Sequence, residues 1–332
     1  MKQLFFALFV VVGFYSCTMR DDNTVYTSFQ GVDTLRAEVH QVPPVMLYPR
    51  GLFLVDSFLV VFNDKMDTCF QVFDRRTLEY QYSFGVHGQG PQDFNMPSGQ
   101  IVDNCNGEVL VLDFNRLKAI NFQQGKPVVS TRTLPAQRSY YNGLLRLNDS
   151  VYICEGDHED NEEYQLIYMD GTVEKKVAYP ESSERFGSVL ARNQAYGRIA
   201  AAHPSGERFA SFYTFTRRFR IMDEKGKILK DVKLDIAPSD SPIAIEPEER
   251  RIHVLAVCAT EKHIYTLNLD MTSQEIYARQ GRPSIQVFSW EGEPLRLHYL
   301  DRFISLFAVD EQARLLYGVF EENENEIYTF PL

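Results

Sequence analysis

The sequence contains few of the residues from which metal sites and common hydrolase centres are built. Its 332 residues include 5 cysteines and 7 histidines, with no C-x-x-C, H-x-H or H-E-x-x-H pattern. No serine lies in a G-x-S-x-G motif either. We therefore predict no structural metal, no cofactor and no catalytic residue from linear motifs. Single acidic residues or histidines from different parts of the fold could still meet to form a metal site.

Basic charge is also scarce, because 34 lysines and arginines stand against 45 acidic residues, a net charge of -11. Such a surface repels nucleic acid and does not attract anionic lipid, so we expect no nucleic-acid partner. A mean hydropathy of -0.27 excludes a polytopic membrane protein. Aromatic residues are plentiful, with 18 Tyr and 24 Phe, and they favour strands. The composition predicts an all-β protein.

The N-terminus has the pattern of a secretory signal, with Lys2, an apolar run over Leu4–Tyr15 and the pair Ser16-Cys17. The apolar run is too short to span a bilayer. Residues 14–17 resemble a bacterial lipobox, with an aromatic residue where Leu is usual. We predict a signal peptide over residues 1–16, a lipid on Cys17 that contacts the membrane, and a tether over residues 17–32. The alternative is a soluble periplasmic or secreted protein.

Short alternating strands recur along the chain in groups. The turns that precede the last strand of each group begin at intervals of roughly 50 residues, which is typical of propeller blades. The first three groups show three strands each and the next two show four. We predict blades over residues 58–83, 109–133, 150–178, 198–234 and 251–299.

The last group of strands, residues 304–330, lacks a fourth member. An isolated alternating segment, Leu35–His40, has no hairpin partner of its own. We predict that it completes this last blade. The result is a six-bladed β-propeller over residues 33–332, closed by an N-terminal strand, a closure that removes exposed sheet edges.

The stretch Tyr82–Pro97 carries Gly85, Gly88, Gly90 and Pro91, which neither a helix nor a continuous strand tolerates. We interpret it as the crossing between two blades. At least one of its glycines should have a positive φ, and Phe94 should be a buried anchor between neighbouring blades. Alternatively, the stretch forms the lip of a ligand pocket, with His87 and Gln89 as candidate binding residues.

Residues 84–94 resemble the G-x-x-G-x-G-P-x-[DE]-F crossing of the TolB-like six-bladed propeller lipoproteins of Gram-negative bacteria. Residues 199–209 and 285–292 are similar to later segments of that family. The resemblance implies an outer membrane lipoprotein, either surface-exposed or periplasmic. Thr18–Asp22 resembles a surface-export signal, or it is only a polar tether. The family has no catalytic signature that could be transferred to this chain.

Other motifs have both a structural and a functional interpretation. Tyr140, Tyr141 and Asn142 open the third blade, where propeller loops surround the channel, and adjacent aromatic rings suit a glycan. The acidic stretch Glu155–Glu163 could hold calcium, but a polar hairpin tip explains it more simply. Arginines and phenylalanines alternate over residues 208–220, either as a stacking platform or as the two faces of strands.

We predict a binding or protein-interaction module that acts as a monomer on an envelope protein or a glycan. The alternative is a metal-dependent hydrolase, lactonase or lyase with its site in the central channel. Cys69, Cys154 and Cys258 lie in apolar strand patterns, where a small buried hydrophobe is the default interpretation. A disulfide remains open, because connectivity cannot be read from sequence.

Overall fold

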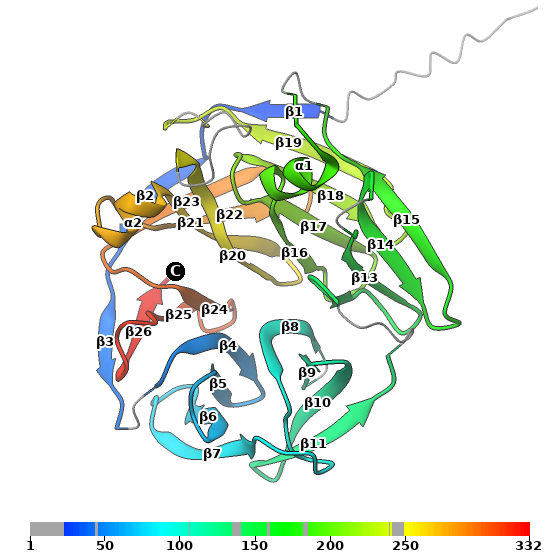
Figure 1. Ribbon diagram of the computed structural model, residues 1–332. Helices are drawn as coiled ribbons and strands as arrows, with labels where there is room; N and C mark the ends of the chain where they lie inside the picture. Colours follow the sequence, from blue (N-terminus) through cyan, green and yellow to red (C-terminus); the bar gives the residue numbers. More distant parts are fainter. Residues whose placement is uncertain are drawn as a thin grey trace, which may run out of the picture.

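Six sheets surround a central axis in the computed structural model, which confirms the predicted all-β six-bladed propeller (Figure 1). The structure describes residues 23–43, 46–105, 107–134, 141–157, 160–181, 185–238, 240 and 249–332. In each sheet, the strand nearest the axis begins an antiparallel meander that proceeds outward. Within the described residues, no helix has the length and apolar character needed to cross a membrane.

The first three blades are four-stranded sheets. Their strands are β4 (Pro49–Val55), β5 (Phe58–Asn63), β6 (Thr68–Asp74) and β7 (Tyr80–Val86); β8 (Pro97–Cys105), β9 (Glu108–Asp113), β10 (Arg116–Gln123) and β11 (Lys126–Arg132); and β12 (Leu145–Arg146), β13 (Val151–Glu155), β14 (Glu162–Tyr168) and β15 (Val173–Ala178).

The other three blades include strands from the N-terminal segment. The fourth has β16 (Arg198–Ala202), β17 (Arg208–Tyr213), β18 (Arg218–Asp223), β19 (Ile228–Leu234) and β1 (Asn23–Tyr26). The fifth has β20 (Arg251–Ala259), β21 (His263–Thr272), β22 (Ser284–Ser289), β23 (Pro294–Leu300) and β2 (Gly31–Leu35). The sixth has β24 (Leu306–Asp310), β25 (Leu315–Val319), β26 (Glu326–Pro331) and β3 (Glu38–Gln41).

The sequence pattern did not identify the innermost strands of the first three blades, β4, β8 and β12. Prolines and glycines interrupt their alternation, and register shifts occur at Pro49/Gly51 and on both sides of Ile101. The glycines are needed where β4 and β8 approach each other, because a Cβ on Gly99 would lie 2.1 Å from the Arg50 carbonyl oxygen. These strands therefore resemble loops in sequence.

Strand β3 closes the ring, as predicted, by pairing antiparallel with β26, and Ile327 lies opposite His40. The closing strand is shorter than the predicted Leu35–His40, however. Leu35 belongs to β2, which runs parallel to β23 on the outer edge of the fifth blade. The predicted strand is divided because the chain crosses from the fifth blade to the sixth between β2 and β3.

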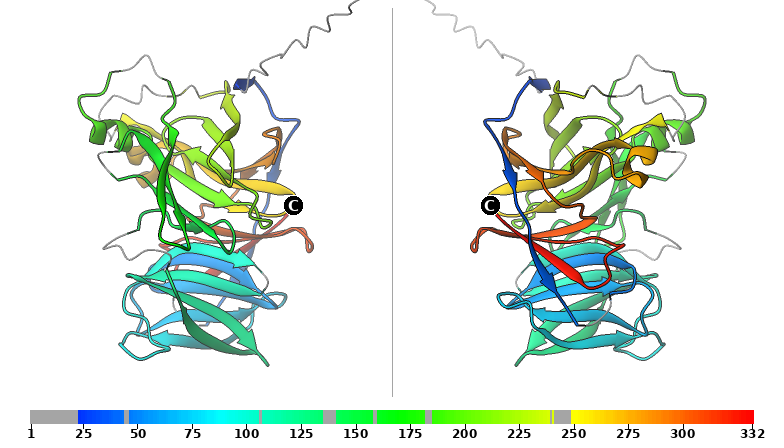
Figure 2. Two further views of the ribbon diagram at one scale, coloured as in Figure 1. Left: turned by 90° about the vertical axis from the view of Figure 1, so that its right-hand side faces the viewer. Right: turned by 90° about the vertical axis from the view of Figure 1, so that its left-hand side faces the viewer.

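Residues 23–41, here called the rim segment, follow the outer edge of the propeller past three blades (Figures 1 and 2). Its first strand, β1, runs parallel to β19 with Asn23 opposite Asp231. The structured region therefore begins before the predicted boundary at residue 33. Strands this short carry no alternation that distinguishes them from a polar tether.

The core consists of apolar clusters between adjacent sheets. Phe94 is fully buried among side chains of the first two blades, and Gly85 has a φ of 79°, so both predictions about the crossing are confirmed. Cys69 and Cys154 are buried, Cys258 is partly buried, and all three are free thiols. The Cys105 side chain lies outside the described residues.

The two faces of the propeller differ in their connections. On one face, here called the turn face, the strands are joined by short turns such as residues 56–57, 124–125 and 260–262. On the opposite loop face, the long connections include residues 87–96 and 273–283 and the described parts of those that follow β11, β15 and β19. The loop face carries α1 (Val189–Ala195), capped by Ser188, and α2 (Ser273–Tyr277), which begins in a capping box. Loops on a rigid scaffold are where binding groups gather.

Candidate functional site

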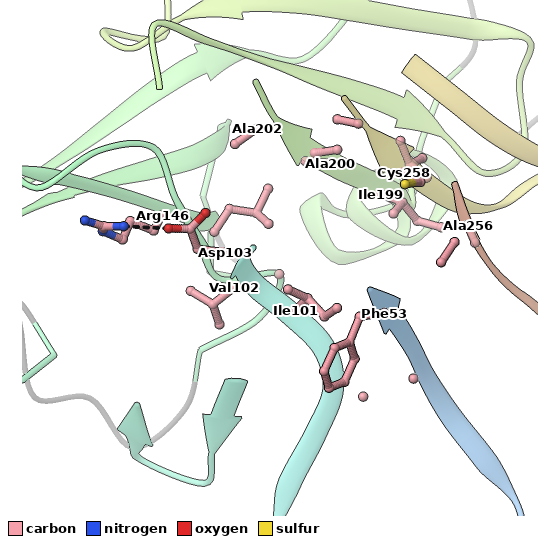
Figure 3. A pocket seen from close by; sticks show the side chains of 18 of the residues that line it. Phe53, Ile101, Val102, Asp103, Arg146, Ile199, Ala200, Ala202, Ala256 and Cys258 are labelled. Atoms are coloured by element: carbon pink, nitrogen blue, oxygen red, sulfur yellow. Dashed lines mark hydrogen bonds and ion pairs between the residues drawn. The ribbon is translucent and has the colours of Figure 1, made fainter. Parts of the chain in front are cut away.

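A cavity of about 940 Å³ occupies the axis of the propeller and is lined by the inner strands of all six blades. Its walls are mostly small or apolar side chains (Figure 3). Ile101, Ile199, Leu255 and Leu306 are only partly buried, and alanines line much of β16. Each inner strand pairs on one side only, so its free edge supplies backbone polar groups to the cavity. A wall of this kind suits a ligand with both apolar and hydrogen-bonding parts.

The mouth on the turn face carries an ion pair between neighbouring blades. Arg146 on β12 lies 2.5 Å from Asp103 on β8 and also pairs with Asp149. Burial opposes the charge of Arg146, but the hydrogen bond to Asp103 and the charges of Asp103 and Asp149 together outweigh this and raise the guanidinium pKa. The Arg146 guanidinium therefore stays charged. His203, also at this mouth, accepts a hydrogen bond from the Ser205 backbone and contacts the Trp290 ring.

The mouth on the loop face is lined by Arg50, Asp64, Asn142, Glu155 and Arg198. Arg198 begins β16, and its side chain is 3% exposed. It donates to the Tyr196 carbonyl oxygen at 3.2 Å and lies 4.0 Å from the Glu155 carboxylate. Asn142 donates to the same carboxylate at 2.8 Å. These contacts hold three polar groups in fixed positions on the channel wall.

Behind Arg198 lies a buried ionic network between the third and fourth blades. Glu163 is fully buried, accepts a hydrogen bond from the Tyr213 hydroxyl at 2.7 Å, and lies 3.5 Å from Arg220. Burial raises the pKa of Glu163 despite the arginines nearby. Arg220 and Arg218 both bind Asp231. Burial alone would raise the pKa of Asp231, but the hydrogen bond from Arg218 and the charge of Arg220 outweigh it and lower that pKa.

The alternating arginines and phenylalanines of residues 208–220 are thus explained by strand faces. The aromatic rings of Phe209, Phe212 and Phe219 point into the core as predicted. Two arginines do not point outward, however: Arg217 and Arg220 are 3% and 5% exposed and are ion-paired. In the sequence, a buried arginine that pairs with an acid alternates with apolar residues in the same way as a solvent-facing arginine.

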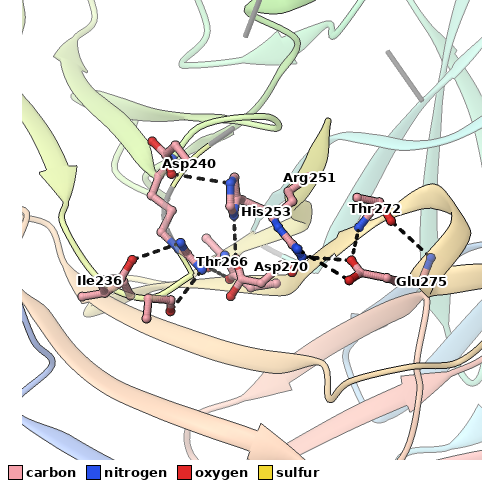
Figure 4. A network of polar contacts seen from close by, with 11 residues as sticks. Ile236, Asp240, Arg251, His253, Thr266, Asp270, Thr272 and Glu275 are labelled. Atoms are coloured by element: carbon pink, nitrogen blue, oxygen red, sulfur yellow. Dashed lines mark hydrogen bonds and ion pairs between the residues drawn. The ribbon is translucent and has the colours of Figure 1, made fainter. Parts of the chain in front are cut away.

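A second polar cluster joins the fourth and fifth blades on the loop face (Figure 4). His253 is fully buried, with Nδ1 2.6 Å from Asp270 and Nε2 3.5 Å from Asp240. Arg217 lies 2.8 Å from Asp270, and its backbone N–H donates to Asp240. Asp240 lies between β19 and β20, and these contacts hold it against both blades.

The residues proposed from sequence lie in different environments. His87 and Gln89 are exposed on the crossing and do not line the cavity; Gln89 donates to Asn95, and His87 lies 3.6 Å from the Cys69 sulfur. Tyr141 is 3% exposed and packs in the core between the second and third blades. Asn142 lines the cavity, and Tyr140 lies outside the described residues. Ligand binding by these residues stays a prediction.

Sequence reasoning missed the channel arginines Arg50, Arg146 and Arg198. Each lies in an inner strand, and two of those strands were not recognised. Arg198 could have been predicted as a channel residue from its position as the first residue of a predicted strand. The other two have no local signal, because their place on the channel wall depends on strands that resemble loops.

The acidic stretch over residues 155–163 forms the turn between β13 and β14. Asp160 is buried and pairs with Lys175 and Gln165, so its carboxylate is used within the hairpin. This favours the hairpin interpretation, although residues 158–159 lie outside the described residues. In the described part of the chain, no group of three or more His, Cys, Asp or Glu side chains could hold a metal ion.

Comparison with solved structures supports the fold. A member of the DUF4221 family from Bacteroides vulgatus superposes with a TM-score of 0.58 at 16% identity, covering 90% of this chain and 97% of that one. A predicted exported protein from Bacteroides fragilis superposes with a TM-score of 0.56 at 11% identity, covering 93% and 98%. A search of curated proteins found no match. The model of the TolB-like 6-blade propeller-like family matches residues 28–312, and the chain belongs to that family.

Proposed function

We propose that this protein is a cell-envelope lipoprotein whose propeller binds a small amphipathic ligand in its central channel. The observation that carries the proposal is the axial cavity of about 940 Å³, whose wall is apolar in its middle and polar at both mouths. Pockets of this size that combine apolar walls with a few fixed polar groups are the usual sites for small ligands. The ion pairs of Arg146 and Arg198 keep those polar groups in place without a ligand.

The envelope location is supported by the N-terminal pattern and by one structural neighbour. The apolar run ending in Ser16-Cys17 fits export followed by lipid attachment. The similar Bacteroides fragilis protein is itself predicted to be exported. A lipid on Cys17 supplies the membrane contact that the acidic surface does not.

Narrowing the channel tests the binding proposal. Ile199→Trp adds bulk to the cavity wall, whereas Leu190→Trp adds the same bulk to the exposed side of α1. We expect octanol and octanoate, titrated against the mature chain and followed by ligand-observed NMR, to bind wild type and Leu190→Trp equally and Ile199→Trp at least tenfold more weakly. Equal binding by all three proteins would exclude the channel as the site.

Fractionation of cells tests the lipid anchor. Cys17→Ala removes the thiol that carries the lipid, so the protein should move from the membrane fraction to the soluble fraction. Thr18→Ala keeps the cysteine and should stay with the membrane. Membrane association that persists in Cys17→Ala refutes the lipobox interpretation. Protease added to intact cells then separates a surface-exposed protein, which is cleaved, from a periplasmic one.

A further inference from the structure

The loop-face mouth of the channel contains an unusual pair of cations on one aromatic ring. The Arg50 guanidinium carbon lies 4.1 Å from the centre of the Tyr48 ring, and the Lys65 ammonium lies 4.3 Å from the same point. Arg50 is on β4 and Lys65 is in the turn between β5 and β6. Two backbone hydrogen bonds join these segments, from Asp64 to the Tyr48 carbonyl oxygen and from Lys65 to that of Leu47.

Tyr48 holds this arrangement with a strained backbone. Its φ is 59°, in the left-handed region that large side chains rarely adopt. Such strain persists only where the surroundings impose it, and it concentrates at binding sites. Tyr48 combines this backbone conformation with contacts to both cations.

Among the residues that the structure describes, neither cation has an acidic partner. Within the described residues, no carboxylate lies within 4.0 Å of Arg50 or Lys65, although Asp64 lines the same mouth. The other two channel arginines, Arg146 and Arg198, are both paired with acids. Two unpaired cations on one ring repel each other, and an anion between them would relieve the repulsion.

We infer that Tyr48, Arg50 and Lys65, here called the mouth clamp, bind the carboxylate or phosphate group of the channel ligand. The inference rests on the proposed channel function and adds the charge and orientation of the ligand. The two cations are separated by at most about 8 Å, since each lies near 4 Å from one point. Charge-assisted hydrogen bonds of about 2.8 Å from both cations to one oxyanion require that they approach it from the same side of the ring, and the inference includes that arrangement.

Arg50 connects the clamp to the channel, because it also lines the cavity. An anionic head group at the mouth would leave the rest of the ligand against the apolar wall formed by Ile101 and Ile199. The ligand is therefore an amphipathic anion that enters from the loop face. A neutral molecule of equal length gains only the apolar contacts.

The test compares octanoate, octyl phosphate, octanol and octylammonium on the full mature chain by NMR titration. The variants are Arg50→Gln, Lys65→Gln and the double variant, with Lys126→Gln, an exposed lysine on β11, as the matched control. We expect the double variant to bind at least one of the two anions about tenfold more weakly. Octanol should be unaffected, and Lys126→Gln should match wild type. The anion whose affinity falls more in the double variant identifies the head group.

The outcomes separate the clamp from the channel. Anions that bind the double variant as well as wild type, or that bind wild type no better than octanol, overturn the clamp but leave the channel proposal standing. The clamp is also overturned if the variants weaken octanol binding as much as anion binding, because they would then have disturbed the channel itself. If no probe binds wild type, both proposals fall. Added salt should weaken the binding of the anions and leave the binding of octanol unchanged.

Discussion

Replacing Phe94 by alanine tests how the crossing between the first two blades is held. The ring is fully buried and lies 4.9 Å from the Phe70 ring. The backbone around it is fixed, because the Phe94 N–H donates to Val86 and its carbonyl accepts from Gly88. The walls cannot move in to fill the space, so the cost should lie in the upper part of the range for a deleted core aromatic, about 4 to 5 kcal/mol.

Equilibrium urea denaturation, followed by far-ultraviolet circular dichroism, measures this change in the free energy of unfolding. The matched control is Phe114→Ala, which removes the same side chain from a position that is 51% exposed. It should cost less than about 1 kcal/mol. If Phe94→Ala falls within about 1 kcal/mol of the control, the crossing is not anchored by this ring, and its role as a pocket lip becomes the better explanation.

Three further predictions concern the same framework. Gly85→Ala should lower the free energy of unfolding by more than about 1 kcal/mol, because φ is 79° and a Cβ would lie 2.8 Å from a ring carbon; Gly187→Ala, in open space, should be neutral in the same urea assay. Deleting residues 1–36 removes β1 and β2 and should cost less stability than deleting residues 1–42, which also opens the sixth blade; equal melting temperatures would contradict the closure. Asp231→Asn should cost about 3 kcal/mol at pH 7. The pKa of Asp231 is lowered in the folded state, so the stability it contributes is complete above the ordinary pKa near 4 and is lost as the pH falls further. In denaturation series between pH 5 and pH 2, the difference in the free energy of unfolding between wild type and Asp231→Asn should therefore shrink as the pH falls.

The parts of the fold that could be predicted are those in which local pattern and structure coincide. The outer strands alternate cleanly, as in β6, and turn residues separate them at a regular interval. The crossing could be recognised from its glycines and proline, and one of these glycines, Gly85, has a positive φ that other residues adopt less easily. The closure was predicted because the last group of strands lacked a fourth member and the alternating segment over residues 35–40 lacked a partner.

The parts that could not be predicted depend on contacts between distant segments. Strand β12 has only 2 residues, and β4 and β8 contain glycines that are explained by each other's backbone. At the candidate site, Arg50 and Lys65 meet because the turn after β5 is hydrogen-bonded to the residues that precede β4. Tyr141, a candidate ligand-binding residue from the sequence, lies in the core, and burial of an aromatic residue in a loop leaves no trace in the sequence.

Ion pairs with at least one buried partner recur at the seams between blades. Arg220 of the fourth blade contacts Glu163 of the third, Arg217 of the fourth contacts Asp270 of the fifth, and Arg75 of the first contacts Asp310 of the sixth. The apolar clusters beside them are built from interchangeable aliphatic and aromatic side chains, which would accept more than one neighbour or register. A buried charge accepts only its partner, because a mismatch leaves it uncompensated. We therefore interpret these pairs as the features that specify blade order and register, while the apolar clusters supply the stability that keeps the channel open.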